Sequence, residues 1–126
     1  MNERYKIGEA KFFLAKMKES LHDRPAFRYY TSAFLTAARS VIQYAREESK
    51  SKGRQKWYEE TIAGYEVLSY KSQIPIRHRF SDWAGSEAPI GSAQRYSEDQ
   101  IGSAQRYLEE LENFVQRGME EGILSG

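Results

Sequence analysis

The chain has 126 residues, a formal net charge of +1, 40% hydrophobic side chains and 29% charged ones. This length fits one domain, so we expect residues 1–126 to fold as a single helical unit. The lack of cysteine excludes disulfides, thiolate metal sites and cysteine nucleophiles. A charged N-terminus and the lack of a long apolar run predict no signal peptide and no membrane contact, so we expect a cytoplasmic protein.

The first two predicted helices follow from the spacing of apolar residues. A helix over residues 3–21 gathers five apolar side chains at helical spacing on one face, namely Ile7, Ala10, Leu14, Met17 and Leu21. A second helix over residues 25–50 carries a wider apolar face. Asp23 and Pro25 precede and open it, and both residue types are typical of a helix start.

Gly53 and its basic neighbours interrupt the helical pattern and predict a turn. A third helix is predicted over residues 54–72, and it ends before Pro75 because proline removes a backbone donor and disfavours helix at the preceding residue. Residues 74–89 lack helical periodicity, which predicts a long loop between the third and fourth helices.

A perfect repeat precedes and enters the fourth predicted helix: the heptapeptide Ile90–Tyr96 returns as Ile101–Tyr107. A spacing of 11 residues turns a helix only about 20° off its own face. The segment Ser97-Glu98-Asp99-Gln100 resembles a capping box, so we predict a helix over residues 98–121 with the first copy as an irregular lead-in. One continuous helix from Ile90 is the alternative. The identity of the copies indicates a recent duplication or an engineered insertion.

The candidate for catalytic chemistry is the loop after the third helix. His78 lies between Arg77 and Arg79, with Lys71 upstream. Histidine titrates near neutral pH, and neighbouring cations can hold a phosphate, which are the groups needed to cleave RNA through its own 2′-hydroxyl. The alternative is a solvated basic loop. The chemistry requires no cofactor, and the two histidines lack metal-ligand spacing, so no metal is expected.

A second basic patch surrounds the turn at Gly53 and contains Lys50, Lys52, Arg54 and Lys56. Such a patch can contact RNA phosphates in a salt-dependent way, whereas a solvated turn is the plainer interpretation. Residues 1–89 carry sixteen Lys and Arg against eleven Asp and Glu, and residues 90–126 carry three against seven. This asymmetry suggests that an acidic end covers a basic face or meets another subunit.

The helix FRYYTSAFLTAARSVIQYA, the following helix with Trp57 and Tyr58, and the run ending in His78 together resemble the HEPN superfamily. The resemblance covers roughly residues 5–80 and implies small, often dimeric helical bundles of prokaryotic defence and toxin–antitoxin systems. Active members are metal-independent RNases whose signature is an Arg, then four to six residues, then a His. Here His78 matches the histidine, and Lys71, followed by a polar Ser72, stands near the place of the arginine.

The sequence therefore predicts an all-α, antiparallel, up-down four-helix bundle with HEPN-like topology. A homodimer is expected because the aromatic and alanine-rich faces exceed what four short helices bury internally. The favoured function is a non-catalytic HEPN-like module that binds RNA or a partner protein. The alternatives are a metal-independent RNase that uses His78 with Lys71 or Arg77, and a purely structural bundle.

Overall fold

The computed structural model describes residues 2–69 and 90–126, with the backbone alone described for residues 90–97. This part of the chain contains four helices, in agreement with the predicted all-α bundle: α1 (Glu3–Glu19), α2 (Arg24–Ser51), α3 (Gln55–Ala63) and α5 (Ile90–Glu120). The predicted long loop between the third and fourth helices lies outside the described residues.

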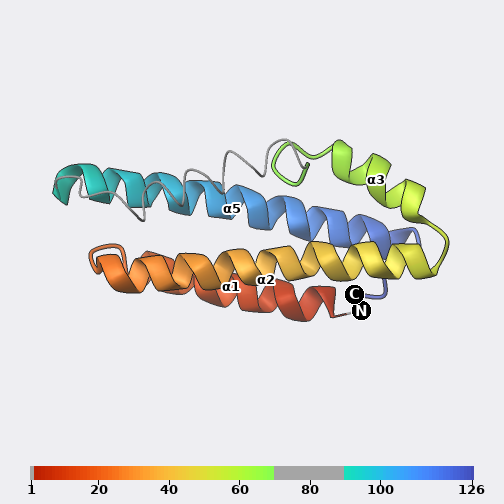
Figure 1. Cartoon of the computed structure of the whole chain (residues 1–126), viewed down its shortest axis with the longest axis horizontal. Coiled ribbons are helices and arrows are strands. Elements are labelled where there is room, and N and C mark those ends of the chain that lie inside the picture. The colour runs from red at the N-terminus through yellow and green to blue at the C-terminus, as the bar shows by residue number, and fades with distance from the viewer. Residues whose placement is uncertain (1, 70–89) are drawn as a thin grey trace.

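Successive helices run in opposite directions along one long axis (Figure 1). The first two form a tight antiparallel hairpin, and α5 packs against both. The short α3 lies beside the C-terminal half of α5, and both chain termini lie at the same end of the bundle. This up-down arrangement confirms the predicted antiparallel bundle.

The hairpin begins where the sequence predicted it. Asp23 is the N-cap of α2, and its Oδ1 accepts a hydrogen bond from the Ala26 backbone N–H at 3.2 Å. At the other end of α2, Gly53 adopts a φ of 70°, which lets the Arg54 N–H reach the Ser49 carbonyl at 2.7 Å. Glycine adopts this left-handed conformation without a steric penalty, so Gly53 determines where the chain turns after α2.

The prediction of a helix over residues 54–72 is wrong for residues 64–69, because α3 ends at Ala63 and the chain continues as turns through Ser69; residues 70–72 lie outside the described residues. Side chains of α5 account for the difference. Oε1 of Glu110 accepts hydrogen bonds from the backbone N–H groups of Val67 and Leu68 at 2.9 and 3.3 Å. These donors therefore have a carboxylate partner in place of the carbonyls that a longer helix would supply.

The prediction of an irregular first repeat copy is also wrong, because α5 begins at Ile90 and both copies lie within it. The eleven-residue spacing permits this, since a helix returns almost to the same face after three turns. Gln100 consequently forms no capping box. Its side chain is fully buried on the core side of α5, in line with Ala104 and Leu111.

The core combines the predicted stripes of α1, α2 and α5 with the chain that follows α5. Phe27, Phe34 and Phe114 are fully buried. After Gly122, which has a φ of 72°, the chain turns back so that Ile123 and Leu124 are also buried. The predicted core did not include this C-terminal segment.

Candidate functional site

The predicted catalytic group lies outside the described residues. This applies to Lys71, Arg77 and His78 and to the predicted phosphate-binding Arg79. Their arrangement therefore stays a prediction, and the geometry of the site is built from the described helices.

The second predicted patch lies at the α2–α3 turn, where Lys50, Lys52, Arg54 and Lys56 are all exposed. Two of these four side chains contact the protein itself. Nζ of Lys52 donates a hydrogen bond to the Ile123 carbonyl at 2.7 Å, and Lys56 lies 3.9 Å from Glu60 on the same helix. Lys52 thus holds the C-terminal segment against α2, which leaves its ammonium group less free to contact a phosphate backbone.

A pair of carboxyl groups closes the same end of the bundle. Glu3 at the start of α1 is fully buried, and its pKa is raised first by that burial and then by a hydrogen bond with Glu48. Burial acts to raise the pKa of Glu48 as well. Hydrogen bonds from Glu3 and from Ser125 outweigh that effect and hold the pKa of Glu48 at about 2. At a pH between these two pKa values, the pair therefore carries one proton on Glu3 and a negative charge on Glu48.

Glu48 uses its charge to hold the end of the chain. The Ser125 backbone N–H donates to one carboxylate oxygen of Glu48 at 3.0 Å, and the Ser125 hydroxyl donates to the other at 2.7 Å. Together with Lys52, this contact ties the C-terminal segment to α2. These contacts have a structural role, and they occupy both oxygens of the Glu48 carboxylate.

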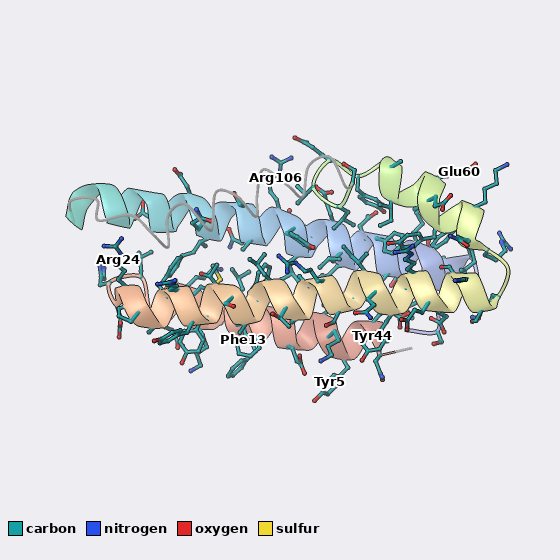
Figure 2. The ribbon with its side chains drawn as sticks, viewed as in Figure 1. Tyr5, Phe13, Arg24, Tyr44, Glu60 and Arg106 are labelled. Carbon is teal, nitrogen blue, oxygen red and sulfur yellow. The ribbon has the colours of Figure 1, made fainter. Side chains whose placement is uncertain are left out.

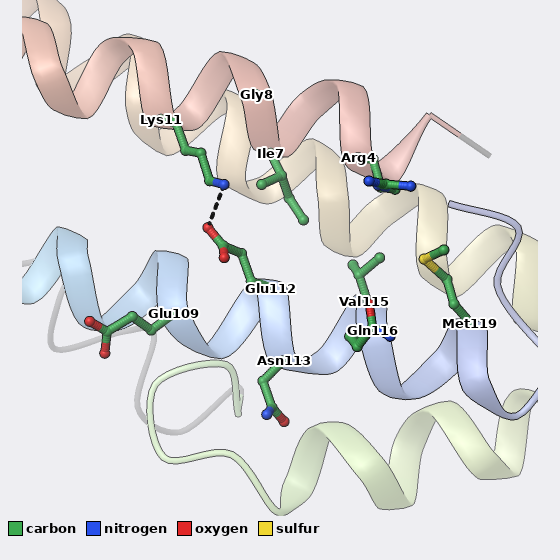
Figure 3. Close-up of a pocket in the computed structure, with 10 residues that line it drawn as sticks. All are labelled: Arg4, Ile7, Gly8, Lys11, Glu109, Glu112, Asn113, Val115, Gln116 and Met119. Atoms are coloured by element: carbon green, nitrogen blue, oxygen red, sulfur yellow. Dashed lines mark ion pairs between the residues drawn. The ribbon is translucent and has the colours of Figure 1, made fainter.

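An open groove of about 590 Å³ runs between α1 and α5 (Figure 3). Its walls carry charges of both signs, including Arg4, Lys11, Glu109 and Glu112. Lys11 and Glu112 bridge the groove with an ion pair of 3.1 Å. A lining with charges of both signs is not complementary to a polyanion such as RNA. It is more complementary to a polar protein segment that carries both signs itself.

The outer surface of the α1–α2 hairpin carries large apolar side chains. The exposed fraction is 69% for Tyr5, 55% for Phe12 and 72% for Tyr29. Figure 2 shows Tyr5 pointing away from the bundle. Phe12 contacts Phe13 edge-on with ring centroids 5.4 Å apart, and Lys16 Nζ lies 5.5 Å from the centroid of the Phe12 ring.

The described residues contain no cluster of three or more His, Asp or Glu side chains that could hold a metal ion. Likewise, none of the described helices is long and apolar enough to cross a membrane. No family model, curated protein or solved structure matches this chain.

Two features of the described residues were not predicted from the sequence, namely the carboxyl pair and the outward aromatic stripe of α1. The first joins residues 45 positions apart, for which a single sequence carries no pairing signal. The second had a signal: Tyr5 and Phe12 are one heptad apart and lie off the apolar stripe that was assigned to the core.

Proposed function

We propose that this chain is a non-catalytic, HEPN-like helical module that works as a dimer and binds protein rather than RNA. The observation that carries the proposal is the apolar outer surface of α1, where Tyr5 and Phe12 are more than half exposed. Exposed aromatic side chains are characteristic of protein-binding surfaces, because they contribute large contact areas at small cost in conformational entropy.

RNA is the less favoured partner because of the distribution of charge. At the α2–α3 turn, Lys52 and Lys56 already contact a carbonyl and a carboxylate of the protein. The groove between α1 and α5 carries Glu109 and Glu112 beside its two basic residues. RNA binding gains affinity from the counterions that unopposed cations release, so a surface with few such cations binds RNA weakly.

The first experiment measures RNA cleavage in EDTA by the unmutated protein and by His78→Ala and Lys71→Ala variants. A binding module gives no cleavage above background in any of the three. Metal-independent cleavage that disappears in both variants, with unchanged circular dichroism, would overturn the proposal. It would establish the RNase alternative, with lysine in place of the family arginine.

The second experiment addresses the dimer and the ligand class. Sedimentation equilibrium of the unmutated protein at micromolar concentration is expected to give twice the chain mass of 14.6 kDa. Fluorescence anisotropy with a labelled RNA is expected to show only weak binding at about 50 mM salt and none at about 200 mM salt. Tight RNA binding that survives this salt and is weakened by Lys50→Ala or Arg54→Ala would contradict the preference for protein.

A further inference from the structure

Helix α1 carries two stripes at heptad spacing, on opposite faces. One stripe faces the core and contains Glu3, Ile7, Ala10, Leu14 and Met17. The other is exposed along its whole length and contains Tyr5, Gly8, Phe12, Ala15 and Glu19. We call the exposed set the outer stripe. Its spacings of 3, 4, 3 and 4 residues are those of a helix that packs along another helix.

The small residues of the outer stripe permit a close approach. Gly8 and Ala15 each lie between two larger members of the stripe. A Cβ atom built on Gly8 would meet nothing within 4 Å, so the space beside it is open. A second helix can therefore bring its backbone near α1 at these two positions and pack its larger side chains into the gaps.

The aromatic side chain at the centre of the stripe has neighbours on its own helix and on the next. Phe12 packs edge-on against Phe13, and Phe13 in turn contacts Tyr30 of α2 with ring centroids 6.5 Å apart. Phe13 and Tyr30 are half-buried and pack against the core. The contacts with Phe13 therefore restrict the exposed Phe12 side chain, which lowers the conformational entropy that Phe12 loses when a partner covers it.

The charges beside the stripe indicate what the partner is. Glu9 and Lys16 lie on the same side of the stripe, three residues before and four residues after Phe12. Each forms an ion pair on its own helix, Glu9 with Lys6 at 3.1 Å and Lys16 with Glu19 at 3.2 Å. If a second copy packs antiparallel with Phe12 at the two-fold axis, Lys16 of each copy lies one residue, about 1.5 Å along the axis, from the level of Glu9 of the other, so each gains a second neighbour of opposite charge. A parallel pair instead brings like residues to the same level.

From this self-complementarity we infer that the outer stripe is a homodimer interface in which α1 pairs antiparallel with α1 of a second copy. The inference rests on the proposed dimeric module and adds its surface and its symmetry. The interface is isologous: Phe12 contacts its own equivalent, and Tyr5 lies opposite Glu19, since each is seven residues from Phe12. A two-fold arrangement of this kind closes on itself and leaves no unpaired stripe for a third copy.

Cysteine cross-linking tests the pairing directly, because the chain has no cysteine of its own. Phe12→Cys is expected to form a disulfide-linked dimer in mild oxidant, since the two Cα atoms must approach to about 4.4–6.8 Å. Ser32→Cys, at an exposed position of α2, is the control and is expected to stay unlinked.

A mixing experiment distinguishes antiparallel from parallel pairing of the two α1 helices. Tyr5→Cys and Glu19→Cys are each expected to stay unlinked alone and to link when the two variants are mixed. In an antiparallel pair, two copies of Tyr5 are separated along the axis by 14 residues, or about 21 Å. Self-linking of both variants, with no mixed product, would mean parallel pairing and would overturn the inference.

The dissociation constant supplies the second measurement. Phe12→Glu is expected to raise it about a hundredfold, because the symmetry places the substitution in the interface twice. Lys16→Glu alone is expected to weaken the dimer about threefold to tenfold, and the Glu9→Lys/Lys16→Glu double variant to restore it. Lys56→Glu is the matched control and is expected to change nothing, because Lys56, like Lys16, forms an ion pair within its own helix but lies away from the outer stripe.

These outcomes separate the inference from the function on which it rests. A dimer that Phe12→Glu leaves intact, with no cross-link at position 12, would overturn this interface and leave the dimeric module standing. A monomer at all concentrations would overturn both. Circular dichroism checks that each variant folds. Every substituted position is exposed except Glu9 and Lys16, which are partly buried, so loss of the dimer does not require loss of the fold.

Discussion

Replacing Phe114 by alanine is the sharpest test of how the helices are held together. Phe114 is fully buried in α5 and contacts three aromatic rings from the α3 region. Trp57 stacks on it with ring centroids 5.6 Å apart, and Tyr58 and Tyr65 each pack edge-on at 6.0 Å. This cluster joins α3 and the turn after it to the rest of the bundle.

The expected loss follows from these contacts. Deleting a fully buried phenylalanine side chain costs about 3–5 kcal/mol of the free energy of unfolding. Each aromatic pair adds about 0.5–1.5 kcal/mol beyond its buried area, so three pairs place Phe114→Ala at the upper end of that range. For a chain of this length the midpoint temperature falls by about 4 °C per kcal/mol, which predicts a drop of about 15–20 °C.

Urea unfolding followed by tryptophan fluorescence measures the effect. The chain has two tryptophans, so a Trp83→Phe background leaves Trp57, in direct contact with Phe114, as the single reporter. Tyr29→Ala is the matched control, because it removes an aromatic side chain that is 72% exposed. That variant is expected to change the free energy of unfolding by about 0.5 kcal/mol or less.

A loss below about 1.5 kcal/mol for Phe114→Ala, with an unchanged dependence on urea, would refute the reasoning. It would mean that the ring cluster does not anchor α3. If the alanine variant is too unstable to measure, Phe114→Leu preserves most of the volume and is expected to cost about 1–1.5 kcal/mol.

Three further substitutions test other parts of the structure. Gln100 is fully buried, and neither of its amide atoms has a hydrogen-bond partner among the residues that the structure describes, so Gln100→Met is expected to raise the free energy of unfolding in urea by about 1–3 kcal/mol; a loss would reveal a partner for the amide. The raised pKa of Glu3 means that the folded state keeps a proton which the unfolded chain releases above its ordinary pKa of 4.5. Stability should therefore fall as the pH rises from 4.5 through the folded pKa, and Glu3→Gln should remove this decline in melting temperatures measured across that range; an identical decline in the variant would place its source elsewhere. A Cβ at position 118 would lie 2.5 Å from Leu124, so Gly118→Ala is expected to lower the melting temperature despite its higher helix propensity. Adding Leu124→Ala should then cost less than it does in the unmutated chain, and strictly additive losses would count against the contact.

Local signals in the sequence predicted the hairpin of α1 and α2 well. Asp23 and Pro25 mark the start of α2, and Gly53 marks the turn after it, because each acts through its own backbone and its nearest neighbours. The buried stripe of α1 was predicted from Ile7 to Met17 for the same reason. These features depend on helix periodicity and capping, which a single sequence contains.

The errors arose where a distant residue competes with a local pattern. The apolar residues that predicted α3 through residue 72 do recur at helical spacing. However, the backbone N–H groups of Val67 and Leu68 donate to the Glu110 carboxylate and not to the carbonyls of a longer helix. At the repeat, Ser97 and Gln100 resemble a helix start, whereas the structure continues α5 through them. A capping pattern inside a longer helix is indistinguishable from a true start until the neighbouring packing is known.

The candidate site divides in the same way. The sequence by itself determined that the chain is helical, the buried stripe of α1 and the basic turn at residues 50–56, since all of these follow from local spacing and composition. The spacing of Tyr5 and Phe12 was also present in the sequence, although it was not recognised as a second stripe. Only the tertiary structure decided which stripe α2 and α5 bury and which stays exposed. It also decided that Glu3 meets Glu48 and that Lys52 meets the C-terminal segment. Contacts between residues far apart in the chain depend on how the helices pack in three dimensions. Helical periodicity determines which residues share a face of a helix, but it does not determine which other helix that face contacts.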